Sequence, residues 1–482
     1  MDELKSKTLS GLFYKFAERI GVQVVTFIVS VILARLLLPE QFGTITLVSV
    51  FITILDVFVT FGFGNSLVVN KNSDDLDFST CFHFGLAFAI ILYIIVWFCA
   101  PYLSVFFDMS EITSLIRVMA LRIPIGAVNS IQHAYVSKLM IFKKFFISTS
   151  IGTIVSAFIA LVMAYQGFGV WALVAQYLGN VILDTLCLSF IVDWRPKMKF
   201  SFSRLKAIYD YGWKILLVGL IDTIYGQLRN FVIAKKYSAA DLAYYGKGLS
   251  FPNMGITTVE PTIDGVIFPA LSNCNDDPTK MKSITRRIIK STTYFIFPLM
   301  IGLMALGKPL IIVLLSEKWI ESVVYLHICC LALIFRPIQV INNCVIRASG
   351  DSTLLLRLDI IKKSVGMVLL VASIPFGVKA VAFSLVIVNL FSTVINIMPN
   401  RRILNYGCRE QLRDIIPNLL LSLAMGAITW AVSFLGYNYL VTLFLQFTVG
   451  VIGYLCLSVI FKSESFYYIM GYIKKMVKHT NC

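Results

Sequence analysis

The sequence predicts an all-α, polytopic membrane protein of about 14 transmembrane helices, arranged as two parallel six-helix repeats plus two C-terminal helices. The first observation behind this is composition, with 58% apolar and 14% charged residues and a mean hydropathy of +0.82, whereas soluble chains carry about 25% charged residues. The second is that the apolar residues gather in blocks of about 20, which is enough for a helix to cross ~30 Å of hydrocarbon. The third is an uneven distribution of basic residues between the predicted loops. Since backbone groups in lipid need internal hydrogen-bond partners, each block is expected to be a helix.

The apolar blocks follow one another along the whole chain with short polar connections. Pro252, Glu260, Pro261 and Asp264 interrupt the eighth of them. The blocks lie at 12–37, 44–69, 80–100, 114–137, 146–165, 171–192, 208–235, 246–272, 291–306, 321–346, 354–374, 380–399, 415–434 and 439–461.

The basic residues predict an orientation. With the N-terminus in the cytoplasm, 28 Lys and Arg lie in or beside the internal segments, whereas four lie in the external loops. This is the positive-inside pattern, and it accounts for most of the net charge of +16 without a nucleic-acid partner. Residues 1–10 lack a short apolar core with a cleavage site, so the first block is expected to be the targeting signal. We therefore predict a multi-pass protein of the inner (cytoplasmic) membrane with both termini in the cytoplasm.

Internal repeats divide the predicted helices into two groups. LPEQFG at 38–43 matches SAADLA at 238–243, and FGVWA at 168–172 matches FGVKA at 376–380. Six helices per repeat give both copies the same orientation, an arrangement found in transporters that bind substrate between the halves. The predicted domains are an N-terminal lobe at 1–195, a C-terminal lobe at 196–402, and two additional helices with a cytoplasmic tail at 403–482.

The chain shows no sign of a metal site, a cofactor or an enzyme. Its ten cysteines form no CxxC pair, and it has only four histidines. Phosphate-cradling, zinc-protease and nucleophile-elbow motifs are lacking as well. We therefore predict no cofactor, no metal and no catalytic residue.

Apart from the three at the start of the eleventh block, which are counted with the internal segments, ten basic residues lie inside the apolar blocks. A charge there costs at least ~2.5–3.5 kcal/mol. Such residues usually face a wet cavity or a partner, so a cationic cavity for an anionic substrate is predicted. Four of them lie near helix ends, and snorkelling to the interface is the alternative for these, Lys15, Arg35, Lys235 and Lys247. The predicted substrate-binding residues are Lys15, Arg19, Arg35, Arg122, Lys214, Arg229, Lys235 and Arg336. The predicted ion-coupling residues are Asp56, Asp222, Glu260 and Asp264.

Helical spacing adds two expectations about these residues. Arg122, Asn129 and His133 share one face of the fourth block, where His133 is expected to be a polar cavity or packing residue rather than a metal ligand. Asp222 and Arg229 share a face of the seventh block but are separated by about 10 Å of helix rise. Their charge partners are therefore expected on other helices.

Seven short segments, in order along the chain, resemble those of the Wzx-type polysaccharide flippases, in particular the colanic acid exporter-like branch. This family belongs to the multidrug/oligosaccharidyl-lipid/polysaccharide (MOP) exporter superfamily. The segments are LARLLLPEQFG (33–43), FGFG (61–64), GVWALV (169–174), YYGKG (244–248), FPALS (268–272), EKW (317–319) and ASG (348–350). In one departure from an exact repeat, Lys379 stands where the first half has Trp171.

The resemblance implies a two-lobed, MATE-like bundle that works by alternating access. The implied substrate is an undecaprenyl-diphosphate-linked oligosaccharide repeat unit, moved across the membrane for surface polysaccharide biosynthesis. Implied partners are membrane lipids and the polysaccharide polymerase and chain-length machinery. The alternatives are another exporter of the superfamily, for drugs or the peptidoglycan precursor, a membrane polymerase or acyltransferase, and a non-catalytic scaffold. A cationic cavity disfavours cationic drugs, and a polymerase would typically have a large external loop.

Overall fold

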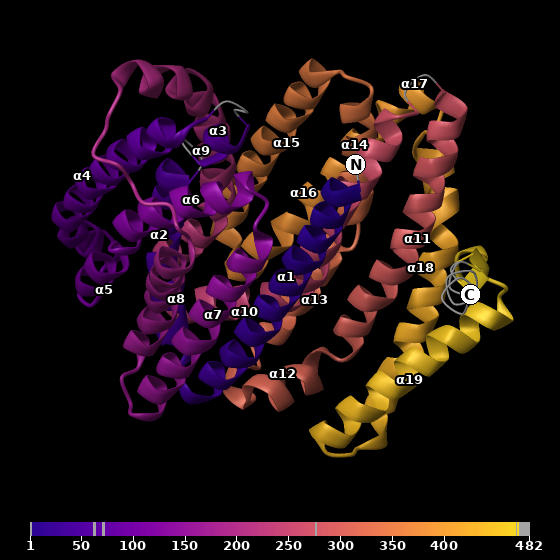
Figure 1. Cartoon of the computed structure of the whole chain (residues 1–482). Helices are drawn as coiled ribbons and strands as arrows, with labels where there is room; N and C mark the ends of the chain where they lie inside the picture. Colours follow the sequence, from indigo (N-terminus) through magenta and orange to yellow (C-terminus); the bar gives the residue numbers. More distant parts are fainter. Residues whose placement is uncertain (1, 61–63, 70–72, 275–276, 469, 472–482) are drawn as a thin grey trace. The chain divides into compact units, whose positions relative to one another are not determined.

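The computed structural model describes the chain except for residues 1, 61–63, 70–72, 275–276, 469 and 472–482 (Figure 1). The described part is helical and without β-strands, and 12 of its helices are long and apolar enough to cross a membrane. Two more predicted spans are the helices α10 (Ala239–Ser272) and α15 (Ser352–Ser373). The predicted all-α, multi-pass membrane fold is thus confirmed, and the predicted number of about 14 spans agrees approximately.

The chain forms two compact units, Met1–Ala243 and Tyr244–Cys482, and the boundary falls in the second turn of α10. α10 is one helix through Pro252 and Pro261, so the residues that interrupt the eighth apolar block do not divide it. The lobe boundaries at residues 195 and 402 remain predictions.

The first unit is a bundle whose fourth span is broken into two helices. Its elements are α1 (Asp2–Leu36), α2 (Pro39–Thr60), α3 (Gly64–Val69), α4 (Asp75–Phe107), α5 (Ile112–Met119), α6 (Arg122–Lys138), α7 (Phe142–Tyr165), α8 (Val170–Ile191) and α9 (Phe202–Lys236).

Small residues allow the closest packing in this unit, between α7 and α8. A Cβ on Gly152 would lie 3.0 Å from the backbone oxygen of Asn180 and 3.1 Å from the backbone nitrogen of Asp184. Without a hydrophobic driving force between helices in lipid, such close backbone approach supplies the van der Waals contact that holds helices together. α1 packs along α7 on this same pair (Figure 1).

The segment between α8 and α9 is anchored to the first unit. Trp194 is buried and packs against the rings of Phe78 and Tyr135, at centroid distances of 5.9 and 5.8 Å. Further along, Lys197 Nζ lies 2.6 Å from Asp75, and Arg204 NH1 lies 3.2 Å from Asp77. These contacts fasten the segment to the N-terminal turn of α4.

The second unit repeats the broken span and adds a C-terminal hairpin. Beyond α10 its elements are α11 (Pro278–Ala305), α12 (Gly307–Leu315), η1 (Glu317–Trp319), α13 (Ser322–Leu333), α14 (Arg336–Ala348), α15, η2 (Ile374–Phe376), α16 (Val378–Ile397), α17 (Asn400–Leu404), α18 (Cys408–Ala431), η3 (Val432–Leu435) and α19 (Tyr439–Ile460). The short helices α3, α12 and α17 were not predicted from the sequence.

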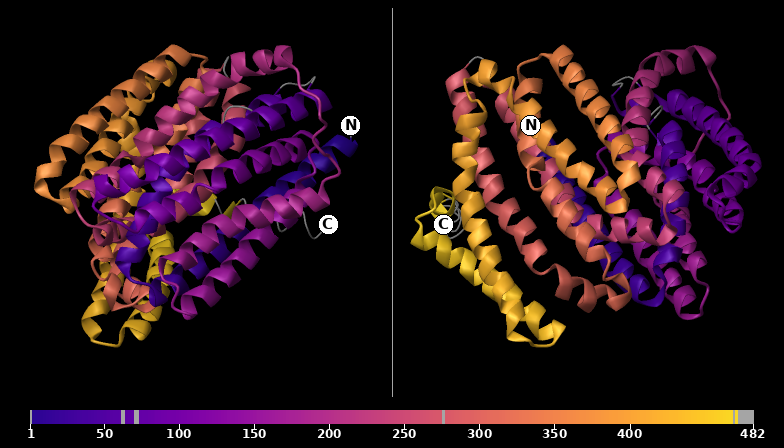
Figure 2. Two further views of the ribbon diagram at one scale, coloured as in Figure 1. Left: turned by 90° about the vertical axis from the view of Figure 1, so that its left-hand side faces the viewer. Right: turned by 180° about the vertical axis from the view of Figure 1, so that it is seen from behind.

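The hairpin α18–α19 packs on α11, as both views of this unit show (Figures 1 and 2). Two buried hydrogen bonds join α11 to α19. Tyr294 donates one to the hydroxyl of Ser458 (2.9 Å), and Tyr454 donates the other to the backbone oxygen of Tyr294 (2.7 Å). Gly426 of α18 faces Ile301 of α11, where a Cβ would lie 2.4 Å from a methyl group. The two additional spans are therefore an integral part of this unit.

Candidate functional site

The same charge pair occurs at the broken span of each unit. In the first, α5 ends at Met119 and α6 begins at Arg122, whose Nε donates a hydrogen bond to Asp56 Oδ2 on α2 (2.9 Å). In the second, α13 ends at Leu333 and α14 begins at Arg336, whose Nε is 2.5 Å from Glu260 Oε1 on α10. Each arginine is thus the first residue after the break, and each carboxylate is on the second span of its repeat.

The sequences after the two breaks explain this correspondence. R-I-P-I-G-A-V-N at 122–129 and R-P-I-Q-V-I-N at 336–342 share the arginine, a proline in the first turn and an asparagine two turns later. A proline in the first helical turn has no amide hydrogen, so it is tolerated where that hydrogen would lack a carbonyl partner. The proline thus favours the start of a new helix at this place, and the arginine is the first residue of that helix.

In the first unit the pair lies in a cavity of about 300 Å³. Asp56, Arg122, Asn129, Ser130 and His133 line it. The expectation that Arg122, Asn129 and His133 share one face is therefore confirmed, and His133 is a cavity residue as predicted.

A buried carboxylate contacts two of the residues that line the cavity. Asp184 of α8 accepts a hydrogen bond from Asn129 Nδ2 at 2.9 Å and lies 2.8 Å from His133 Nε2. Its side chain is only 8% exposed, and Gly152 of α7 lies directly against it. Asp184 was not among the predicted site residues, because only tertiary packing shows what it faces.

Amides stand in the corresponding region of the second unit. Asn342, the counterpart of Asn129, exchanges hydrogen bonds with Gln411 at 3.0 and 2.9 Å, and it also pairs with Asn400. Gln339 donates to the backbone oxygen of Asn389 at 2.9 Å. The repeat thus conserves the arginine–carboxylate pair, whereas the adjoining polar contacts are ionisable in the first unit and neutral in the second.

The other predicted site residues whose side chains the structure describes lie on α1 and α9. Arg19 and Arg35 are exposed on α1, Lys214 and Asp222 are exposed on α9, and Arg229 is half-buried there. Lys235 donates to the backbone oxygen of Phe106, and its Nζ is 3.9 Å from Asp108 Oδ2 and 4.3 Å from the Phe106 ring centroid. The side chains of Lys15 and Asp264 lie outside the described residues. Of the predicted set, the structure brings together Asp56 with Arg122 and Glu260 with Arg336.

Two other membrane-depth cations contact aromatic rings. The guanidinium carbon of Arg117 lies 4.5 Å from the Trp97 ring centroid, and Lys247 Nζ lies 5.6 Å from that of Trp319. Ring faces attract cations electrostatically, which lowers the cost of placing these charges away from bulk water. Among the described residues, no group of acids, histidines or cysteines has the arrangement of a metal site.

Curated relatives are involved in polysaccharide biosynthesis. The succinoglycan biosynthesis transport protein ExoT of Rhizobium meliloti is 25% identical over 61% of this chain, and the match spans 59% of ExoT. The lipopolysaccharide biosynthesis protein WzxC of Escherichia coli is 20% identical over 88% of this chain and 89% of WzxC. The teichuronic acid biosynthesis protein TuaB of Bacillus subtilis is 22% identical, covering 77% of this chain and 78% of TuaB.

Solved structures share the fold. The lipid II flippase MurJ in an inward closed conformation matches 94% of this chain and 98% of its own, with 16% identity and a TM-score of 0.74. An inward-facing MATE multidrug resistance transporter of the MOP superfamily matches 79% of this chain and 94% of its own, with 16% identity and a TM-score of 0.64. A family model described as "Polysaccharide biosynthesis protein" matches residues 32–324. The chain is a multi-pass membrane protein that belongs to this polysaccharide biosynthesis family.

Proposed function

We propose that the chain is a flippase that moves undecaprenyl-diphosphate-linked oligosaccharide repeat units from the cytoplasmic to the outer leaflet by alternating access. Membership of the polysaccharide biosynthesis family and the fold shared with MurJ support this class of substrate. The observation that carries the proposal is the duplicated pair, Arg122 with Asp56 and Arg336 with Glu260, set at the broken span of each repeat. We place the protein in the inner membrane with both termini in the cytoplasm.

The arginines are suited to a diphosphate. A guanidinium presents planar, paired N–H donors that match two phosphate oxygens, and it stays charged at any relevant pH. Around Arg122, the Asn129 amide, the Ser130 hydroxyl and the His133 ring line the same cavity and add further hydrogen-bonding groups. The diphosphate docks on these groups while the lipid tail remains in the bilayer.

The carboxylates supply a way to couple transport to an ion gradient. A diphosphate that takes the guanidinium of Arg122 displaces Asp56, and one that takes Arg336 displaces Glu260. A displaced carboxylate at membrane depth then needs a cation or a proton, because an uncompensated charge there is costly. Substrate and coupling ion therefore bind together at each pair. Asp222 and Asp264 are proposed as additional ion-coupling positions.

The remaining predicted cations, Lys15, Arg19, Arg35, Lys214, Arg229 and Lys235, are proposed to guide the anionic headgroup along α1 and α9. The polysaccharide polymerase and chain-length machinery are proposed as partners that consume the flipped units. No catalytic residue or cofactor is required for this reaction, since no covalent bond is made or broken.

The decisive experiment is reconstitution of the full chain in liposomes that contain a labelled undecaprenyl-diphosphate oligosaccharide. An impermeant glycosidase added outside should digest the oligosaccharide that the wild-type protein moves across the membrane. Arg122→Gln and Arg336→Gln should each abolish the movement. Arg122→Lys should retain part of it, since a lysine keeps the positive charge but lacks the planar, paired N–H donors of the guanidinium. No outward movement by the wild-type protein would refute the proposal.

A matched control separates the site from a general loss of charge. Arg117→Gln removes the same charge five residues earlier in the same broken span, where the side chain contacts Trp97 rather than the cavity. This variant should remain active. Equal activity with the peptidoglycan precursor in place of the oligosaccharide would favour the alternative substrate. Formation of longer glycans would indicate a polymerase.

A further inference from the structure

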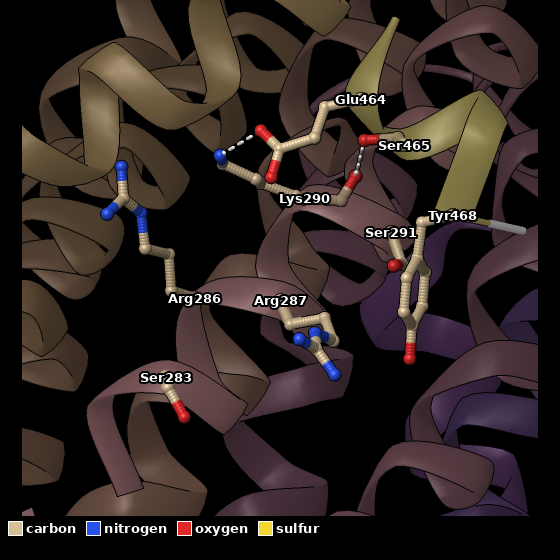
Figure 3. A pocket seen from close by; sticks show the side chains of 8 residues that line it. All are labelled: Ser283, Arg286, Arg287, Lys290, Ser291, Glu464, Ser465 and Tyr468. Carbon is tan, nitrogen blue, oxygen red and sulfur yellow. Dashed lines mark hydrogen bonds and ion pairs between the residues drawn. The ribbon is translucent and has the colours of Figure 1, made fainter. Parts of the chain in front are cut away.

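A second polar pocket, of about 400 Å³, lies on the N-terminal half of α11 (Figure 3). Ser283, Arg287 and Ser291 follow one another at intervals of four residues, so they form a single stripe on one face of this helix. Tyr468, from the segment after α19, closes the pocket beside Ser291 (Figure 3). The stripe places one guanidinium between two hydroxyl groups, which is a set of donors for phosphate oxygens.

The cations of this pocket, Arg286, Arg287 and Lys290, outnumber the carboxylates that contact them by one. Arg286 donates two hydrogen bonds to Asp414 of α18, both at 2.7 Å, and Lys290 Nζ lies 2.7 Å from Glu464 and 3.4 Å from Asp414. Two carboxylates thus accompany two of the three cations. Arg287 is exposed, and its guanidinium carbon is 4.8 Å from the ring centroid of Tyr468. None of the carboxylates in the described part of the chain is within ion-pair distance of Arg287.

An apolar cavity of about 640 Å³ adjoins the polar pocket and shares Lys290, Glu464 and Ser465 with it. Its other wall is a stripe of α18, Ile416, Leu420 and Ala424, again at intervals of four residues. Ile416 is 44% exposed and Leu420 is 60% exposed. The two cavities together therefore offer a charged end and an apolar extension, which is the shape of a lipid.

The length of α11 sets the depth of the charged end. Its 28 residues span about 42 Å, whereas the hydrocarbon layer is about 30 Å thick. If its last residue, Ala305, is at one boundary of the hydrocarbon, the first eight or so residues lie beyond the other. Arg286 and Arg287 are then at that boundary, and Lys290 is one turn inside it, from where their long side chains can reach the headgroups. Cations at this level are attracted to anionic lipids.

We propose that this paired cavity binds an anionic phospholipid, with its phosphate on Arg287 and Lys290 and an acyl chain along Ile416, Leu420 and Ala424. One cation without a carboxylate matches the single negative charge of a phosphodiester better than the higher charge of a diphosphate. The lipid bridges α11, α18 and the segment 464–468, so it stabilises the attachment of the C-terminal hairpin. This site is distinct from the pairs at the broken spans and does not depend on the transport proposal.

The test is native mass spectrometry of the purified full chain, titrated with phosphatidylglycerol or with phosphatidylcholine of the same acyl chains. Phosphatidylglycerol should bind more tightly, and Arg287→Gln should weaken its binding roughly fivefold or more, since one basic residue near an anionic headgroup contributes about that factor. Leu420→Glu should weaken the binding of both lipids. Lys280→Gln is the matched control, because it removes the same charge from the same helix outside the pocket, and it should bind like the wild type.

Three results would overturn the proposal. One is equal affinity for the two lipids, which needs no variant and so does not depend on how a variant folds. Another is wild-type affinity in Arg287→Gln, measured on protein that is monodisperse. The third comes from competition, in which glycerol phosphate or a polyprenyl diphosphate displaces phosphatidylglycerol at lower concentration. Displacement by glycerol phosphate would indicate a site for a soluble anion, and displacement by the polyprenyl diphosphate would indicate a substrate site.

Discussion

Replacing Asp56 with Asn should destabilise the protein more than replacing Asp56 and Arg122 together. In the single variant, the guanidinium of Arg122 loses the carboxylate at 2.9 Å and stays at membrane depth without that compensation. Arg122→Gln added to Asp56→Asn removes the uncompensated charge. The two substitutions should therefore be strongly non-additive.

The expected coupling energy follows from the exposure of the two side chains. They are 33% and 20% exposed, so the pair is between a fully buried and a surface pair. Removing one partner of a fully buried pair costs about 3–5 kcal/mol, and exposed pairs contribute about 0–1 kcal/mol. A coupling of about 1–2 kcal/mol is expected here, which is roughly a 5- to 30-fold change in the unfolding equilibrium.

The assay is reversible unfolding of the purified protein in bicelles for the wild type, both single variants and the double variant. Lys144 and Asp193 provide a control cycle, because their charged atoms are 3.5 Å apart and Asp193 is fully exposed. That pair should show a coupling close to zero. A coupling between Asp56 and Arg122 no larger than the control value would refute the assigned pairing.

Three further predictions concern the packing of the first unit. Gly152→Val should lower the melting temperature, because its side chain would meet the backbone of α8, at a cost of about 1–3 kcal/mol. Gly85→Ala is the control and should leave the melting temperature unchanged, because the space around its Cβ is open. Equal effects of the two substitutions would contradict the assigned close approach of α7 and α8. Trp194→Ala should cost about 3–5 kcal/mol and speed proteolysis after residue 193, because it removes the buried ring that anchors this segment; wild-type cleavage rates would contradict that anchoring. The pKa of Asp74 is lowered, chiefly because its carboxylate accepts the backbone hydrogen bond of Asp77. The stability that the ionised Asp74 carboxylate contributes is therefore complete above the ordinary aspartate pKa of ~3.9 and is lost as the pH falls further. The melting-temperature difference between wild type and Asp74→Ala should accordingly shrink below pH ~4. A difference that grew on acidification would contradict this assignment.

The membrane fold was predictable because lipid imposes strict demands on the sequence. In the described part of the chain, every predicted span is occupied by one helix or by two helices in succession. The face shared by Arg122, Asn129 and His133 lines one cavity. Helical periodicity is a local property, so residues four or seven apart can be placed on a face before any packing is known.

The charge pairs were not predictable in the same way. Asp56 and Arg122 are 66 residues apart, and Glu260 and Arg336 are 76 apart, so only the packing of separate helices decides that they meet. The breaks at 120–121 and 334–335 were also missed, since apolar residues continue through both of them. The cations of α11 were assigned to orientation alone, and their pocket depends on where the segment after α19 comes to lie.

The order of acid and base along the chain matters for how the protein is made. In both units the carboxylate is synthesised first, and its arginine follows 66 or 76 residues later. At a synthesis rate of roughly 5–20 residues per second, Asp56 and Glu260 wait about 3–15 s for their partners. During that interval neither acid has its arginine, so each is more costly to hold at membrane depth than it is in the assembled unit. Arrival of the broken helix then supplies the arginine, so the carboxylate of each unit is compensated only after the fourth span of its repeat has been inserted.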